Sequence, residues 1–160
     1  MTDRPRLSLE RAFTNPIDEV WELWTTKAGI ESWWGPEGFS VAVRELDLRP
    51  GGRLVYVMSA TGRDQIEYMK KSGMPLTTEQ HVVYEEVAPP RRLLFRSLAD
   101  FIPGVEPYEV DTLVELHEVA GGVRMVLSFE AMHDEHWTNL MVMGKEGEVR
   151  RLEALLAARS

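Results

Sequence analysis

The sequence of 160 residues contains no cysteine. The chain therefore cannot form disulfides, zinc–thiolate sites or iron–sulfur clusters, and it cannot use a thiol as a nucleophile. The absence of disulfides fits a reducing compartment, and we expect a cytoplasmic location.

Basic residues are also scarce. The chain has 18 Lys and Arg against 26 Asp and Glu, for a formal net charge of −8. Nucleic-acid-binding proteins usually carry a basic patch, so the charge predicts no nucleic-acid partner.

Long hydrophobic runs are missing as well. No apolar run approaches the roughly 18 residues that suggest a membrane span. The first residues, MTDRPRLSLERAF, are interrupted by charges and lack the apolar segment of a secretory signal. We therefore expect neither a secretory signal nor a membrane partner.

The remaining composition is that of a folded domain. Hydrophobic residues make up 44% of the chain and charged residues 28%, which excludes global disorder. No linker, low-complexity tract or repeat divides the sequence. We predict a single domain over residues 1–160.

The first segments predict a strand followed by two short helices. Leu7 and Leu9 alternate with polar residues in a strand over 6–13. Asn15 and Pro16 then suit the N-cap and the first position of a helix. A second short helix is expected over about 27–34.

Six further segments predict strands. In the first of them a change of hydrophobic phase predicts a β-bulge, and Gly121-Gly122 predicts a hairpin between the last two. The segments are 39–48, 53–60, 79–87, 91–98, 108–118 and 122–131.

From about residue 134 the hydrophobic period becomes helical. Asp134 suits the N-cap of a helix of roughly six turns, with its apolar residues on one broad face. The order β-α-α-β-β-β-β-β-β-α predicts an α+β helix-grip fold, in which a curved seven-stranded antiparallel sheet wraps around this helix. The long connections 61–78, with a possible short helix, and 99–107 are expected to form the mouth of a cavity.

This order and several local motifs resemble the START-like, birch-allergen-like helix-grip superfamily. Within it, the chain looks like the branch named after the activator of the heat-shock protein 90 ATPase. The resemblance covers nearly the whole chain. It is carried by RAFTNPIDEVWELWTT, WWGPEGF (Trp33 to Phe39), LDLRPGGRL (Leu46 to Leu54) and the closing helix.

The resemblance implies a fold with a pocket. Members include small-molecule binders, cyclase-like proteins acting on polyketides, and co-chaperones. Two features of the last helix depart from relatives: Gly144 is followed by Lys145 where relatives often have a Gly-Trp pair, and relatives tend to place a small or apolar residue near Glu148.

A charge pair stands on the apolar face of that helix. Glu148 and Arg151 are three residues apart and can pair. A carboxylate facing a cavity can act as acid or base or orient a polar ligand. The interpretation that we favour from sequence is that the helix end leaves the sheet, so that both groups reach solvent.

Aromatic residues and methionines are the other candidates for a cavity wall. Trp24 and Trp33 are expected in the core, with Trp34 or Trp137 touching the pocket. The predicted ligand-binding residues are Trp34, Tyr56, Met58, Met69, Tyr84, Phe95, Phe101, Trp137, Met141 and Glu148.

A metal or cofactor site is not predicted. His133 and His136 bracket the motif HDEH, but no convincing third ligand is visible and short histidine motifs match by chance. The sequence lacks a Walker loop, a G-x-S-x-G elbow and a dinucleotide-binding glycine motif.

Three functions remain open. The first is binding of a small hydrophobic or amphipathic molecule between sheet and helix. The second is an enzyme of the cyclase or hydrolase kind, with Glu148, His81 or Tyr84 as acid or base. The third is a co-chaperone-like protein binder, and a homodimer is possible in each case.

Overall fold

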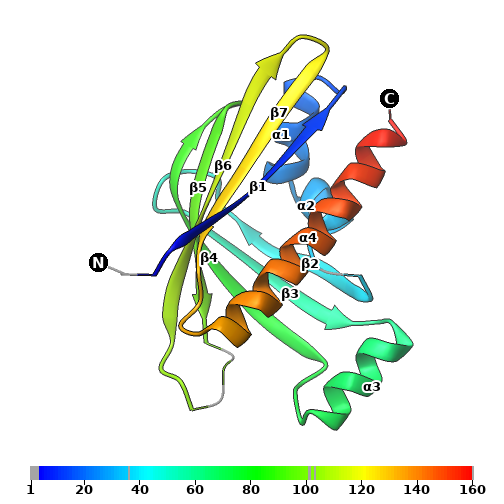
Figure 1. Cartoon of the computed structure of the whole chain (residues 1–160), viewed down its shortest axis with the longest axis vertical. Coiled ribbons are helices and arrows are strands. Elements are labelled where there is room, and N and C mark those ends of the chain that lie inside the picture. The colour runs from blue at the N-terminus through cyan, green and yellow to red at the C-terminus, as the bar shows by residue number, and fades with distance from the viewer. Residues whose placement is uncertain (1–3, 36, 101, 103, 160) are drawn as a thin grey trace.

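The computed structural model describes residues 4–35, 37–100, 102 and 104–159. Within them, the predicted order of elements is confirmed, and the 61–78 connection holds a short helix (Figure 1). The elements are β1 (Arg6–Phe13), α1 (Ile17–Thr25), α2 (Lys27–Trp33), β2 (Phe39–Leu46), β3 (Arg53–Ala60), α3 (Arg63–Lys71), β4 (Thr77–Ala88), β5 (Arg92–Ala99), β6 (Tyr108–Val119), β7 (Gly122–Glu130) and α4 (Glu135–Ala157).

The strands form one antiparallel sheet in the order β1-β7-β6-β5-β4-β3-β2. Neighbours in the sheet are consecutive in the chain except β1, which pairs with β7. The predicted bulge in β2 is confirmed, because the register with β3 shifts between Val43 and Glu45. Helix α4 crosses one face of the curved sheet, and α1 and α2 lie beside its C-terminal half (Figure 1).

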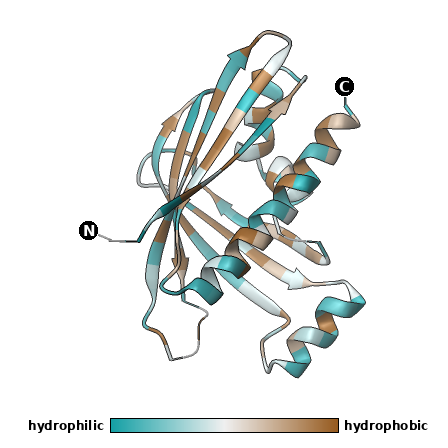
Figure 2. Ribbon diagram, viewed as in Figure 1, coloured by the Kyte–Doolittle hydropathy of each residue, from teal (hydrophilic) through white to brown (hydrophobic). Residues whose placement is uncertain are grey.

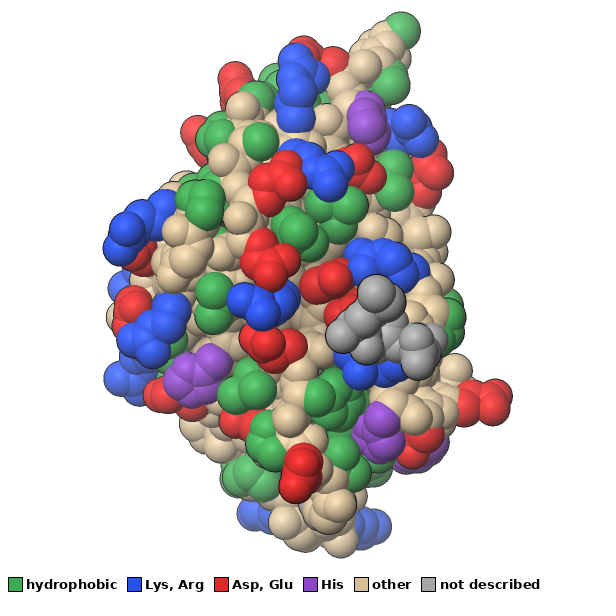
Figure 3. All heavy atoms as spheres, turned by 90° about the vertical axis from the view of Figure 1, so that its left-hand side faces the viewer, with side chains coloured by type: hydrophobic (Ala, Val, Ile, Leu, Met, Phe, Trp, Pro, Cys, Tyr) green, Lys and Arg blue, Asp and Glu red, His purple; other side chains and the backbone are tan. Residues whose placement is uncertain are grey.

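Alternation along the strands separates the two faces of the sheet (Figure 2). On β7, Val123, Met125 and Leu127 are buried in the hydrophobic core on the helix side. The opposite face carries ion pairs: Arg96 lies 2.7 Å from Glu85 and 3.0 Å from Glu109. Figure 3 shows acidic and basic side chains interspersed over this face, as expected for a solvated surface.

Tryptophans of α1 and α2 fill the core under the sheet. Trp24 and Trp33 meet edge to face with ring centroids 4.6 Å apart, and both are buried, as predicted. The indole Nε1 of Trp33 donates to the carbonyl of Leu23 at 2.7 Å. The pair therefore fixes the angle between the two helices.

The prediction that Asn15 caps α1 was wrong by one residue. Helix α1 begins at Ile17, Pro16 occupies the cap position, and no side chain caps the helix. The buried Asn15 amide instead donates to the carbonyl of Leu156, at 3.0 Å, near the end of α4. The terminal carbonyls of a helix need partners, and Asn15 supplies one across the fold.

Helix α4 starts where the sequence predicts. The Asp134 carboxylate accepts a hydrogen bond of 2.8 Å from the backbone N–H of Trp137, which is N-cap geometry. The C-terminal half of the helix buries Leu152 and Leu156 in the main core. No helix in the described part of the chain is long and apolar enough to cross a membrane.

Candidate functional site

A cavity of about 360 Å³ lies between α4 and the strands β3 to β6. The face of α4 that borders it comes from the N-terminal half of the helix, before the helix reaches the main core. The sheet and helix contribute Tyr56 and Met58 on β3, Gln80 on β4, Thr112 on β6, and Trp137, Gly144, Lys145 and Glu148 on α4.

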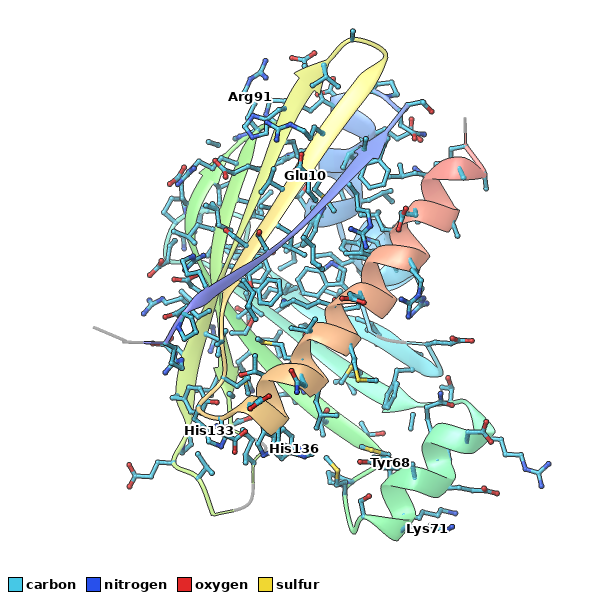
Figure 4. All side chains as sticks on the ribbon, viewed as in Figure 1. Glu10, Tyr68, Lys71, Arg91, His133 and His136 are labelled. Carbon is cyan, nitrogen blue, oxygen red and sulfur yellow. The ribbon has the colours of Figure 1, made fainter. Side chains whose placement is uncertain are left out.

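Methionine is the most frequent residue in the wall. Five line the cavity, and we call them the methionine wall: Met58, Met69, Met74, Met132 and Met141. Met69 comes from α3 and Met74 from the loop after it, so the 61–78 connection borders the cavity, as the sequence suggests. Helix α3 itself buries no residue and lies at the edge of the fold, where Figure 4 labels its Tyr68 and Lys71.

The 99–107 connection plays a different part. Ala99 at its start lines the cavity, but Ile102 is buried in a small second core with Val110 and Met132. This second core closes one end of the space. Phe101, a predicted ligand contact, lies outside the described residues.

The inner end of the cavity is polar. Burial raises the pKa of Glu148, an effect opposed by Lys145, by the backbone N–H of Gly35 and by Arg151. Burial lowers the pKa of Lys145, which Glu148 opposes. Burial, together with the charge of Glu148, raises the pKa of Tyr56. These three side chains form the polar end of an otherwise largely apolar space.

The expectation that the helix leaves the sheet at Glu148 and Arg151 was wrong; both side chains are half-buried. Helix α4 stays on the sheet beyond them, since Leu152 is fully buried. Glu148 faces the cavity. Arg151 turns to the segment after α2, where its Nη1 donates to the carbonyls of Gly35 at 2.7 Å and Trp34 at 3.3 Å.

Three of the predicted contact residues lie behind the wall. Trp34, Tyr84 and Phe95 are 6%, 1% and 4% exposed and belong to the main core. None of them is among the described residues that line the cavity. They support it, because the ring of Trp34 packs edge to face on that of Tyr56 with centroids 5.4 Å apart.

The candidate base His81 faces away from the cavity. It follows Gln80, which lines the cavity, so strand alternation turns His81 to the outer face. There its Nε2 lies 3.1 Å from a carboxylate oxygen of Glu79. The structure therefore does not place His81 with Glu148.

Lys145 is one of the wall residues that sequence reasoning missed. Its spacing could have indicated a place in the wall. Lys145 follows Met141 by four residues and precedes Glu148 by three, so all three lie on one face of the helix. Lysine is almost never fully buried, and from sequence Lys145 stood out only as the residue after Gly144 where relatives often have tryptophan. Thr112, on β6, was also missed.

The HDEH motif lies at the start of α4 (Figure 4). His133 Nδ1 lies 2.7 Å from the hydroxyl of Tyr108, and the ring of His136 packs edge to face on Trp137. Among the described residues, no group of three or more His, Asp or Glu side chains is arranged to hold a metal ion.

Comparison with known proteins decides the family. The family model described as "Activator of Hsp90 ATPase homolog 1-like protein" matches residues 14–157. This chain belongs to that family. The match spans the two short helices, the sheet from β2 onward and all of α4, so it includes every described residue that lines the cavity.

Solved structures agree on the fold of this Hsp90-activator-like chain. The AHSA1 protein from Silicibacter pomeroyi has a TM-score of 0.76 at 21% identity, with 98% of this chain and 100% of that chain covered. A protein from Mycobacterium smegmatis has a TM-score of 0.74 at 23% identity, with 99% and 94% covered. A protein from Chromobacterium violaceum has a TM-score of 0.74 at 22% identity, with 94% and 96% covered. No curated protein matches the sequence significantly.

Proposed function

We propose that this protein binds a small hydrophobic or amphipathic molecule in the cavity between the sheet and α4. The observation that supports this is the cavity itself. Its volume of about 360 Å³ lies within the range of small-molecule sites. Its wall combines apolar side chains with a few polar groups at one end, a combination that holds and orients a ligand.

The methionine wall suits a ligand of variable shape. Methionine side chains are unbranched and polarisable, so they fit irregular apolar surfaces. Burial of apolar ligand surface contributes roughly 25 cal/mol per Å², before the entropy cost of association. Affinity would therefore come from the methionine wall, and orientation from the polar end.

The first test is native mass spectrometry of freshly purified protein, with the adduct identified after denaturation. A bound organic molecule supports the proposal and names a chemical class. The same spectrum gives the oligomeric state, and so tests the proposed homodimer. If the protein is purified without a bound molecule, binding of an apolar fluorescent dye tests whether the cavity accepts a ligand.

Gly144 offers a matched pair of variants. It lines the cavity, and a Cβ added there would meet no heavy atom of the described residues within 4 Å. Gly144→Leu should place its side chain in the cavity and abolish binding. Gly144→Ala should leave most of the space and retain binding. Equal binding by the two variants would place the ligand elsewhere and contradict the proposal.

A second function that the same cavity supports is acid–base catalysis by Glu148. The favouring observation is a carboxyl group that faces the cavity with its pKa raised by burial. Tyr84 and His81 do not line the cavity, so Glu148 is the one predicted acid or base that remains in place. Turnover of a bound molecule by the wild type and its loss in Glu148→Gln would support this function.

A third function follows the family's name, regulation of a chaperone ATPase. The net charge of −8 disfavours association with an acidic partner. A pull-down that returns the chaperone at physiological salt would favour this function over ligand binding. The cytoplasmic location remains part of the proposal, supported by the absence of cysteine.

A further inference from the structure

The ammonium group of Lys145 lies in the cavity wall without a hydrogen-bond acceptor. Within the described part of the chain, no carboxylate oxygen lies within 4.0 Å of it and no side-chain hydrogen bond satisfies it. Its Nζ lies over the ring of Phe129, 5.0 Å from the ring centroid. Lys145 is half-buried, and an ammonium group that faces a largely apolar space is costly without an acceptor.

A second polar group without a partner adjoins it. Thr112 is 2% exposed and lines the cavity, and its hydroxyl makes no hydrogen bond to any described residue. Thr112 pairs with Phe129 across β6 and β7. Phe129, whose ring lies under the Lys145 ammonium, is therefore also the cross-strand neighbour of Thr112. Both donors line the cavity and neighbour Phe129.

The fixed charges around this point do not balance. Lys145 and Arg151 are positive, and both act on Glu148, the negative group between them. Among the described residues, Lys145 and Glu148 are the only Asp, Glu, Lys or Arg side chains that line the cavity, and Arg151 stands behind Glu148. The hydrogen bonds of Arg151 go to backbone carbonyls and not to a second carboxylate. One further negative charge would make the inner end neutral.

We infer that the polar end of the cavity is a subsite for the carboxylate of an amphipathic monocarboxylic acid, with Lys145 as its counter-ion and Thr112 as a second donor. This inference rests on the proposed binding function. The acid enters with its carboxylate first, and its apolar body lies along the methionine wall. An amine would add a third positive charge, and an alcohol would leave the excess charge in place.

The test compares three molecules that share one carbon skeleton: 4-phenylbutyrate, 4-phenyl-1-butanol and 4-phenylbutylamine. Binding is measured by calorimetry on the wild type and on Lys145→Met, which keeps an unbranched side chain. The control is Lys27→Met, the same change at an exposed lysine on α2. Thr112→Val, which keeps the shape of the side chain, is the second variant.

The wild type and Lys27→Met should bind the carboxylate about tenfold more tightly than the alcohol, as expected for a hydrogen bond to a charged group. In Lys145→Met this preference should disappear, while the alcohol still binds. Thr112→Val should weaken the carboxylate alone. Retained binding of the alcohol shows that Lys145→Met is folded. If Lys145→Met does not fold, the carboxylate preference is tested with Thr112→Val alone.

Two results overturn the inference in different ways. If the alcohol or the amine binds the wild type as tightly as the carboxylate, or if both variants keep the preference for the carboxylate, the subsite is wrong and the binding function stands. If none of the three molecules binds the wild type, the proposed function fails and the subsite fails with it.

Discussion

The guanidinium of Arg151 donates a hydrogen bond of 2.7 Å to the backbone carbonyl of Gly35. The backbone N–H of the same glycine lies near the carboxylate of Glu148 and lowers its pKa, against the effect of burial. Gly35 has a φ of +89°, a conformation that residues other than glycine rarely adopt. The segment after α2 thus presents a donor and an acceptor to neighbouring turns of α4.

Replacement of Arg151 should destabilise the protein. Arg151→Met leaves the carbonyls of Trp34 and Gly35 without their donor, and we expect a loss of about 1–3 kcal/mol in the free energy of unfolding. Urea unfolding measures it. Arg150→Met, at an exposed neighbouring position, is the control and should change stability little. Equal effects of the two changes would show that the contacts of Arg151 contribute nothing.

Gly144→Ala should stabilise the protein by about 0.5–1 kcal/mol. Glycine inside a helix costs conformational entropy that alanine does not, and the added methyl group points into open space. Thermal unfolding tests this. Gly52→Ala should do the opposite, because its Cβ would collide with the backbone carbonyl of Asp47. A destabilised Gly144→Ala would mean that the cavity cannot accept even one carbon atom.

Tyr84→Phe should leave stability unchanged or raise it by up to about 1 kcal/mol. The Tyr84 hydroxyl is buried without a hydrogen-bond partner among the described residues, so its removal relieves a desolvation cost. Chemical unfolding measures the change. A clear loss of stability would reveal a partner for the hydroxyl. If the protein proves to be an enzyme, unchanged turnover in this variant would exclude Tyr84 as its acid or base.

The stability contribution of Glu148 should depend on pH. Burial raises its pKa above the ordinary 4.5, so the folded protein retains this proton at pH values where the unfolded chain has lost it. Stability therefore falls as pH rises above about 4.5. Glutamine does not ionise, so the wild type should lose stability relative to Glu148→Gln as the pH rises above about 4.5.

Urea unfolding at several pH values measures this difference. Glu106→Gln removes an exposed carboxyl group and serves as the control, with a nearly constant difference from the wild type. A constant difference for Glu148→Gln as well would contradict the burial of that carboxyl group.

The fold was predictable because its signals are local and repeated. Alternation in β7, the phase change in β2 and the capping aspartate of α4 each report backbone geometry within a few residues. Asn15 shows the limit. Its residue type suits a helix cap, but its partner, the carbonyl of Leu156, stands 141 residues away and has no local signature.

The cavity was predictable only in part. Tyr56, Met58 and Met141 were expected in the wall and lie there, although the nearly continuous apolar run over 53–60 does not show which face of that strand points inward. The depth of a residue along the sheet is a tertiary property. For this reason Tyr84 and Phe95, which also point inward, lie under α1 and α2 instead of in the cavity.

The two halves of α4 rest on different supports. Its last turns lie on close-packed side chains, whereas its first turns border the cavity. Amide hydrogens of the first half should therefore exchange with solvent sooner than those near Leu152, although both halves are regular helix. Any molecule that fills the cavity should reduce this gradient, and the protection of one half of a single helix would then report occupancy.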